Sequence, residues 1–305
     1  MRARLENMSV RRKALLGVGL YVLIAILIGI VFGTAAPEPF LPQDEFLLEP
    51  WIPIVIGPVD LSITKAVLYL FLACGATIGA MLYVANRMAA RPNSVQTAVE
   101  TIYDFTRNTI TRGNMDEKMA ARWFAVTSTL FLFILLSNLI GYIPLPINTL
   151  HPLVIFGVEI PSLALYAATA NLSIPLVLTL VVWFSYHVEG IRHKGFVSYF
   201  KGWVPSGVTG IAAIPIFGIE VISHFVRLIS LSVRLFANVL AGHLLILFMG
   251  GGLAVLLGIA VLGWVTLPAA IAFFVFEIVL IAGLQAFIFA NLTSIYLGEA
   301  TGEGH

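Results

Sequence analysis

The chain has 305 residues, of which 59% are hydrophobic and 11% are charged, and its mean hydropathy is +0.98. Soluble globular domains carry about 25% charged residues, so this composition excludes an ordinary soluble domain and predicts a polytopic helical membrane protein. The formal net charge of +1 gives no reason to expect a nucleic-acid partner, and the single cysteine, Cys74, excludes an internal disulfide and a multi-cysteine metal site.

Residues 1–60 are predicted to form a variable N-terminal region. Five basic residues lie in the first 13 positions, and an apolar run from Ala14 to Ala36 follows them. We expect this run to be a retained first membrane span, because it is longer than the apolar core of a usual signal peptide; the alternative is a signal peptide cleaved near Thr34-Ala35-Ala36. Pro37 to Asp60 contains five acidic and no basic residues, which is typical of an exterior loop.

Residues 61–305 are predicted to form one membrane domain, which begins with a span from Leu61 to Ala85. The next segment, Arg87 to Arg122, carries six basic residues and is expected to be cytoplasmic. Within it, four positions share one face of an amphipathic helix: Val95, Val99, Ile102 and Phe105/Thr106. This helix is expected to lie on the inner membrane surface; an ordinary cytoplasmic helix is the alternative.

Two further spans are predicted from Trp123 to Ile143 and from Ala164 to Tyr186, joined by an exterior loop without basic residues. Asn138 and Asn171 lie near the outer ends of these spans, where they either belong to a polar path or cap helices. Of the 17 Lys and Arg residues, 14 fall in the N-terminal tail or in the two inner loops. The positive-inside rule therefore places both chain termini in the cytoplasm if the first span is retained.

The remainder contains two long apolar segments, Val208 to Met249 and Pro268 to Leu297. At 1.5 Å per residue the first would be ~63 Å long, about twice the ~30 Å hydrocarbon core of a bilayer. We therefore expect it to tilt steeply, to bend at Pro215, or to break. The glycines and Pro268 between the segments indicate a chain reversal. The expected fold is all-α, with five or six membrane helices, a steeply tilted C-terminal hairpin and an amphipathic surface helix.

The most unusual residue of the hairpin is Arg234, a permanent cation inside an apolar segment. Placing a guanidinium in the middle of a bilayer costs from ~3 to more than 10 kcal/mol, so a functional role is the default hypothesis. Glu220 and Arg227 precede it at seven-residue intervals on one helical stripe, and Asn238 follows one turn later. The second apolar segment carries two polar residues of its own in Glu277 and Gln285.

These residues belong to recognisable motifs. The first is Arg234-Leu-Phe-Ala-Asn238-Val-Leu-Ala-Gly242, and the second combines Leu284-Gln285-Ala-Phe-Ile-Phe289 with Leu292-Thr-Ser-Ile-Tyr-Leu297. Together they closely resemble subunit a of the F-type rotary ATP synthase. The resemblance extends over about Leu61 to Leu297, with weaker matches around Pro92 to Glu100, at Asn138 and at Asn171.

The resemblance implies a proton-conducting stator, which is not an enzyme on its own and needs no cofactor or metal. Arg234 would meet the carboxylates of a rotating c-ring and keep two aqueous half-channels apart, so that proton flow drives rotation and ATP synthesis. The implied partners are the c-ring proteolipid oligomer, the subunit b peripheral stalk, the rest of the ATP synthase complex and the lipid bilayer. The implied location is the bacterial cytoplasmic (inner) membrane.

A register for the hairpin follows from its antiparallel arrangement. The positions of His243 and Glu277 have nearly the same sum as those of Arg234 and Gln285, which places the chain reversal near residue 260. His243 and Glu277 are thus predicted to lie at one depth as a proton relay, because histidine titrates near neutral pH. Gln285 is expected to hydrogen-bond near Arg234.

Two features of this register differ from the expected pattern. Some relatives carry an acid at the position of His243 and a histidine near that of Glu277, so this chain has the exchanged arrangement. Glu277 also precedes Gln285 by eight residues where seven are expected. Glu220 and His224 are predicted to be further polar groups of a channel; alternatively His224 is an interfacial histidine, and Glu220 simply pairs with Arg227.

Two other function classes can contain polar residues in membrane helices. A secondary ion transporter or another polytopic channel is the alternative, although no internal repeat is evident. An intramembrane hydrolase lacks support, since the sequence contains neither His-Glu-x-x-His nor Gly-x-Ser-x-Gly. Copurification with a proteolipid ring and ATP-hydrolysing soluble subunits would distinguish the stator from both.

Overall fold

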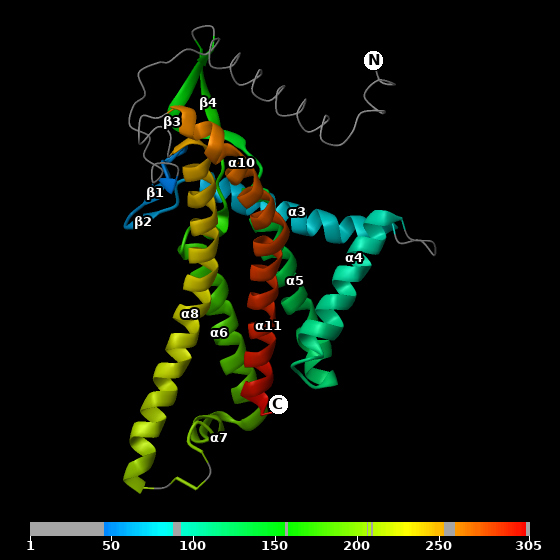
Figure 1. Cartoon of the computed structure of the whole chain (residues 1–305). Helices are drawn as coiled ribbons and strands as arrows, with labels where there is room; N and C mark the ends of the chain where they lie inside the picture. Colours follow the sequence, from blue (N-terminus) through cyan, green and yellow to red (C-terminus); the bar gives the residue numbers. More distant parts are fainter. Residues whose placement is uncertain are drawn as a thin grey trace.

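The computed structural model describes residues 46–87, 93–155, 158–205, 207–208, 210–252 and 260–302. Within these residues, five helical segments are long and apolar enough to cross a membrane (Figure 1). This confirms the prediction of an all-α polytopic membrane protein. The predicted first span, Ala14 to Ala36, lies outside the described residues.

The first half of the chain forms α3 (Lys65–Arg87), α4 (Ser94–Asp104), the π-helical η2 (Phe105–Thr111) and α5 (Glu117–Gly141). Side-chain caps fix where two of these helices begin. Asn93 accepts a hydrogen bond from the backbone N–H of Gln96 at 2.8 Å, and Asp116 accepts from the N–H groups of Lys118 and Met119. Both satisfy donors that the first turn of a helix leaves free.

The predicted amphipathic segment is helical, as α4 and η2, and its apolar face turns toward other helices except at Val95, which is exposed. Val99, Ile102 and Thr106 line a groove of about 510 Å³ together with Met81 of α3 and Phe124 of α5. In Figure 1, α3 lies across α5, and α4 returns along the side of the bundle. The expected position of this segment on the inner membrane surface stays a prediction.

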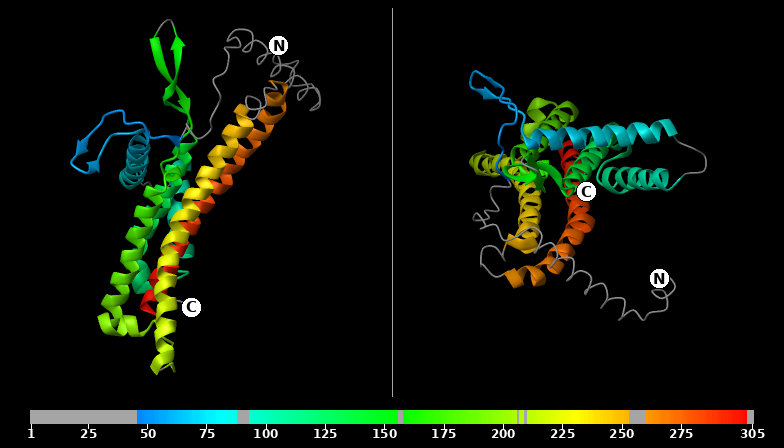
Figure 2. Two further views of the ribbon diagram at one scale, coloured as in Figure 1. Left: turned by 90° about the vertical axis from the view of Figure 1, so that its left-hand side faces the viewer. Right: turned by 90° about the horizontal axis from the view of Figure 1, so that it is seen from above.

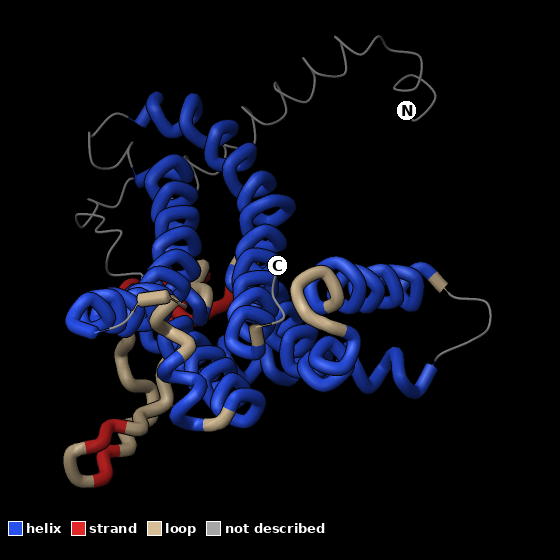
Figure 3. Tube along the Cα trace, turned by 90° about the horizontal axis from the view of Figure 1, so that it is seen from below, coloured by secondary structure: helices blue, strands red, loops and turns tan. Residues whose placement is uncertain are grey.

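Two short hairpins occupy the segments that were expected to be exterior loops. They are formed by β1 (Val55–Ile56) with β2 (Val59–Asp60) and by β3 (Leu145–Ile155) with β4 (Val158–Ala164). The first hairpin projects away from the helices (Figures 2 and 3). The β-branched residues of both segments favour strands.

The second half contains the short η3 (Ala168–Ala170), α6 (Ser173–Lys194) and α7 (Phe196–Lys201). The long hairpin follows. Its first arm is η4 (Gly210–Ala212), α8 (Ala213–Leu247) and the π-helical η5 (Phe248–Gly252); its second arm is α10 (Ala260–Phe276), the π-helical η6 (Glu277–Ile281) and α11 (Ala282–Thr301). Figure 2 shows the arms side by side.

The structure excludes a break at Pro215, one of the alternatives left by the sequence, while the tilt of the hairpin in the membrane stays a prediction. Pro215 lies in the first turn of α8, where no intrahelical hydrogen bond needs its missing N–H, so the helix does not break there. Pro268, expected at the start of the second arm, instead lies inside α10, which begins at Ala260. Gly251 leaves helical geometry with a φ of 150°, a value that glycine adopts readily, and so begins the reversal.

The core lies between α5, α6, α8 and α11. Its fully buried members include Ile134 of α5, Leu235 of α8, and Ala286, Phe289 and Ala290 of α11. Small residues on α11 let neighbouring helices approach closely. In a membrane such close packing holds helices together, because lipid removes the hydrophobic driving force between them. Toward its lower end in Figure 1, α8 diverges from α11, and α6 contacts both.

Candidate functional site

Three side chains from three elements meet near the turn of the hairpin, and we call Tyr142, His243 and Glu277 the upper cluster. The Tyr142 hydroxyl donates a hydrogen bond to Glu277 Oε2 at 3.0 Å. The Tyr142 ring stacks on the His243 imidazole with ring centroids 4.8 Å apart. All three residues are at least nine-tenths buried, with exposed fractions of 3%, 0% and 6%. The structure therefore brings His243 and Glu277 together around a residue that the sequence analysis missed.

The environment of His243 suits a group that gains and loses a proton. Its Nδ1 and Nε2 atoms lie 3.0 and 3.2 Å from the carbonyl oxygens of Val239 and Gly141. A neutral imidazole has one N–H and can donate to only one of these carbonyls, whereas an imidazolium donates to both. The site thus offers a hydrogen-bond acceptor for the proton in either position on the ring.

Glu277 reaches this cluster because Gly242 has no side chain. A Cβ atom at Gly242 would overlap the carboxyl carbon and both carboxyl oxygens of Glu277. The carboxyl group therefore lies against the backbone of α8, one residue from His243. This contact agrees with the prediction that His243 and Glu277 lie at one depth, while their role as a relay stays a prediction.

The π-helical turn η6 explains the eight-residue interval between Glu277 and Gln285. In a regular α-helix eight residues would turn Glu277 ~80° away from Gln285, since each residue turns ~100°. A π-helical turn accommodates one extra residue, and η6 spans Glu277–Ile281, between the two side chains. Both side chains are consequently buried.

Asn138 connects α5 to two other elements below this cluster. Its Oδ1 accepts a hydrogen bond from the Thr169 hydroxyl at 2.7 Å, and its amide nitrogen lies 3.5 Å from the Ala282 carbonyl oxygen. Asn171 instead accepts a hydrogen bond from the backbone N–H of Ser173 at 2.9 Å, at the start of α6. Asn171 thus makes a local contact of the capping kind, which is one of the two roles expected for it.

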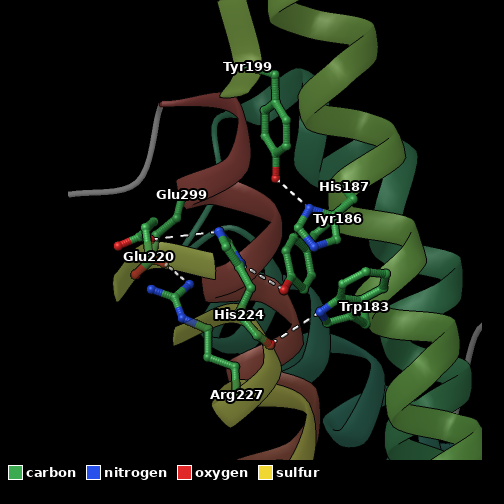
Figure 4. A network of polar contacts seen from close by, with 8 residues as sticks. All are labelled: Trp183, Tyr186, His187, Tyr199, Glu220, His224, Arg227 and Glu299. Carbon is green, nitrogen blue, oxygen red and sulfur yellow. Dashed lines mark hydrogen bonds and ion pairs between the residues drawn. The ribbon is translucent and has the colours of Figure 1, made fainter. Parts of the chain in front are cut away.

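A second polar site lies near the opposite end of the hairpin, and we call it the lower cavity (Figure 4). It encloses about 300 Å³ between α6, α7, α8 and α11. Aromatic and charged side chains share its wall: Tyr186, Lys194, Tyr199, Trp203, Glu220, His224, Arg227, Tyr296 and Glu299. Both Glu220 and His224, expected as channel groups, therefore line one cavity.

His224 is held in the wall of the lower cavity by contacts on both ring nitrogens. Its Nδ1 is 3.0 Å from the Tyr186 hydroxyl, and its Nε2 is 3.7 Å from a carboxylate oxygen of Glu220. The Trp183 indole N–H also donates a hydrogen bond to the backbone carbonyl of His224 at 3.2 Å. Figure 4 shows Trp183 and Tyr186 of α6 reaching His224 on α8.

Arg227 pairs with Glu299 across the hairpin, at 2.7 Å, and not with Glu220. The alternative in which Glu220 and Arg227 form a simple pair is therefore wrong. Glu220 is left close to His224, and Arg227 ties α8 to the end of α11. The lower cavity consequently contains both an ion pair and a separate carboxylate.

His187 of α6 anchors α7 beside the lower cavity. Its Nδ1 is 2.7 Å from the Tyr199 hydroxyl, while its buried Nε2 has no hydrogen-bond partner in the described part of the chain. Burial raises the pKa of Tyr199 to about 12, so the phenol stays protonated at any physiological pH. No sequence motif pointed to His187 or Tyr199, because they meet only through the turn at Gly195.

Arg234 lies between the two sites and faces outward. It is exposed on α8, as is Asn238 one turn later, and within the described residues it forms no ion pair. It is ten residues, ~15 Å, from His224 and nine residues, ~14 Å, from His243 along the helix. Gln285 is buried, and no hydrogen bond joins it to Arg234 in the described structure. Their expected proximity stays a prediction.

A metal centre finds no support in the described ranges, which contain no group of three or more His, Cys, Asp or Glu side chains able to hold an ion. The available chemistry is that of proton exchange between carboxylate, imidazole and hydroxyl groups. Two such clusters flank an outward-facing guanidinium on one helix.

A family model and curated relatives that match this chain all carry the name of one ATP synthase subunit. The family described as ATP synthase A chain matches residues 67–298. The curated ATP synthase subunit a of Bradyrhizobium diazoefficiens is 34% identical over 270 residues, which cover 87% of this chain and 98% of the relative. The proteins of that name from Parvibaculum lavamentivorans and Rubrobacter xylanophilus are 34% and 33% identical, over 89% and 83% of this chain and 97% and 90% of the relatives.

Proposed function

Because the chain belongs to the ATP synthase A chain family and is an integral membrane subunit of that complex, we propose that it is the proton-conducting stator of an F-type ATP synthase. In this proposal the upper cluster belongs to one aqueous half-channel and the lower cavity to the other. Arg234 separates them. The observation that carries the proposal is the position of Arg234 on α8, exposed and midway between the two polar sites.

The proposed partner at Arg234 is a ring of c subunits, each with one carboxylate in the membrane. Two unit charges ~4 Å apart attract by ~4 kcal/mol at an effective dielectric constant of 20. Arg234 therefore favours the ionised form of an arriving carboxylate, whereas the apolar surroundings elsewhere on the ring favour the protonated form. Each carboxylate gives up its proton to one half-channel and takes up another from the other, so the ring turns in one direction.

The membrane and the remaining partners follow from the same proposal. We place the chain in a bacterial cytoplasmic membrane, with the lower cavity facing the cytoplasm. Lys194 lines that cavity, Arg192 and Lys201 belong to the same short connecting segment of the sequence, and the positive-inside rule applies to short loops. The upper cluster then opens to the exterior. Subunit b of the peripheral stalk would hold the chain stationary.

The test is proton movement in the reconstituted complex after Arg234→Ala. We expect ATP-driven pumping to be lost, while vesicles stripped of the soluble subunits keep or increase their passive proton leak. Arg234→Lys should also fail to pump, because an ammonium is a compact charge that can itself lose its proton when buried. Ser230→Ala, one turn away on the same exposed face, is the control and should pump normally.

Normal coupled pumping by Arg234→Ala would contradict the proposal and leave Arg234 with a structural role. Loss of pumping together with loss of assembly would not be accepted as support. The amounts of ring and soluble subunits that copurify with each variant must therefore match those of the unmodified complex.

A further inference from the structure

Tyr142 lies at the end of α5, and both its backbone and its side chain are held by neighbouring groups. It is the C-cap of α5, where its backbone N–H donates to the Leu139 carbonyl at 3.2 Å. Its ring packs edge-on against Phe274 of α10 with centroids 5.8 Å apart. With an exposed fraction of 3%, its side chain has one defined place between α5, α8 and α10.

From that place Tyr142 contacts both titratable groups of the upper cluster. Its hydroxyl donates to Glu277, and its ring face covers the imidazole of His243. Within the described residues, Tyr142 is the one hydrogen-bond donor to the Glu277 side chain. A carboxyl group that is 6% exposed depends strongly on a single donor, because hydrogen bonds to charged groups are stronger than neutral ones.

We propose that Tyr142 is a positioning residue for proton transfer at Glu277, holding the carboxyl group against Gly242 and beside His243. The inference rests on the proposed function. Without the hydroxyl, Glu277 loses the contact that selects one side-chain rotamer, and the distance to its proton donor or acceptor is no longer fixed. Proton transfer requires hydrogen-bond distances, so loss of this positioning slows transfer while leaving both titratable groups in place.

The substitution that isolates the hydroxyl is Tyr142→Phe, which keeps the stacking ring. We expect the rate of proton uptake at a fixed driving force to fall about tenfold, as for the loss of one hydrogen bond to a charged group. The infrared band of the Glu277 carboxyl group, identified by its disappearance in Glu277→Gln, should shift. A role of Tyr142 in packing alone would leave this band unchanged.

Tyr69→Phe is a matched control. Tyr69 has an exposed fraction of 1%, and its hydroxyl donates to the Ile143 carbonyl at 3.2 Å, so the control also removes a buried, hydrogen-bonded hydroxyl. It should leave both the rate of proton uptake and the infrared band unchanged. In a Glu277→Gln background, Tyr142→Phe should add no further loss of rate, because position 277 then carries no exchangeable carboxyl proton for Tyr142 to position.

The outcomes separate the two proposals. A normal rate and an unshifted band in Tyr142→Phe, with a slow Glu277→Gln variant, would overturn the role of Tyr142 and leave the half-channel intact. A normal rate in Glu277→Gln would overturn the half-channel at this position and the role of Tyr142 with it. If Tyr142→Phe does not assemble, fluorotyrosine at position 142 keeps the ring and hydroxyl but alters the hydroxyl's acidity, and an unchanged band would then contradict the inference.

Discussion

Gly242 shows how one missing side chain fixes a functional group. The Glu277 carboxyl group occupies the space where any larger residue at position 242 would place its Cβ atom. The same glycine closes the motif that begins at Arg234, so the motif carries both the cation and the gap for the acid. The site therefore depends on the missing side chain of Gly242 as well as on its reactive groups.

We expect Gly242→Ala to displace Glu277 from Tyr142 and to slow proton uptake about as much as Glu277→Gln does. Overpacking of this kind also costs ~1–3 kcal/mol of stability, which is measurable as a lower thermal unfolding temperature in detergent. Gly218→Ala on the same helix has open space around its new Cβ atom and should change neither quantity. Normal proton uptake in Gly242→Ala would mean that Glu277 does not need its place against α8.

The π-helical turn η6 acts at the scale of an element. It accommodates one residue more than a regular helix would, and so keeps Glu277 on the face of Gln285 despite their eight-residue interval. The turn also lies opposite Gly242, where the arms of the hairpin are in contact. Helix geometry here compensates for a change in sequence spacing.

Deletion of Val279, whose side chain is 73% exposed, should therefore be tolerated. The shortened segment can form a regular α-helix in which seven residues separate Glu277 from Gln285, and these turn through almost two full turns. Proton uptake should therefore stay close to normal. Insertion of one alanine after Val279 would turn Glu277 ~100° away and should abolish uptake. Equal loss of uptake in the deletion and the insertion would show that the turn itself, and not the facing of Glu277, is required.

At the scale of the whole molecule, the outer face of α8 needs a partner that is apolar and also carries negative charge. Large apolar residues on it are exposed, including Ile222, Val226 and Val233, and Arg234 stands among them. Lipid can cover the apolar residues but gives the guanidinium no counter-charge. A ring of helices with membrane carboxylates provides both an apolar surface and a partner for Arg234.

Ala237→Trp should reduce the amount of proteolipid ring that copurifies with the chain. Ala237 is exposed on α8 next to Asn238, and a large ring there would hold the two helical surfaces apart. Val177→Trp, at an exposed position on α6, presents the same bulk to another face and should not reduce copurification. Equal copurification of both variants would place the ring on a different surface.

More of the fold than of the site could be predicted from the sequence. Hydropathy located the membrane helices, and the motifs around Arg234 and Gln285 indicated the family that the comparisons then showed. Tyr142 was missed because it ends an apolar span and its partner Glu277 lies 135 positions away. His187, Tyr199 and Glu299 were missed for the same reason, since the lower cavity forms only where α6, α7, α8 and α11 meet.

The sequence by itself determined which segments enter the membrane and which polar residues they carry there, because apolar length and the cost of a buried charge are local properties. Only the tertiary structure decided which of those polar residues meet. Arg227 pairs with Glu299 and not with its neighbour on the same stripe, and Glu277 meets Tyr142 from a different helix. Hydrogen bonds and ion pairs act over a few ångströms, so they depend on helix register and packing, which no local pattern specifies.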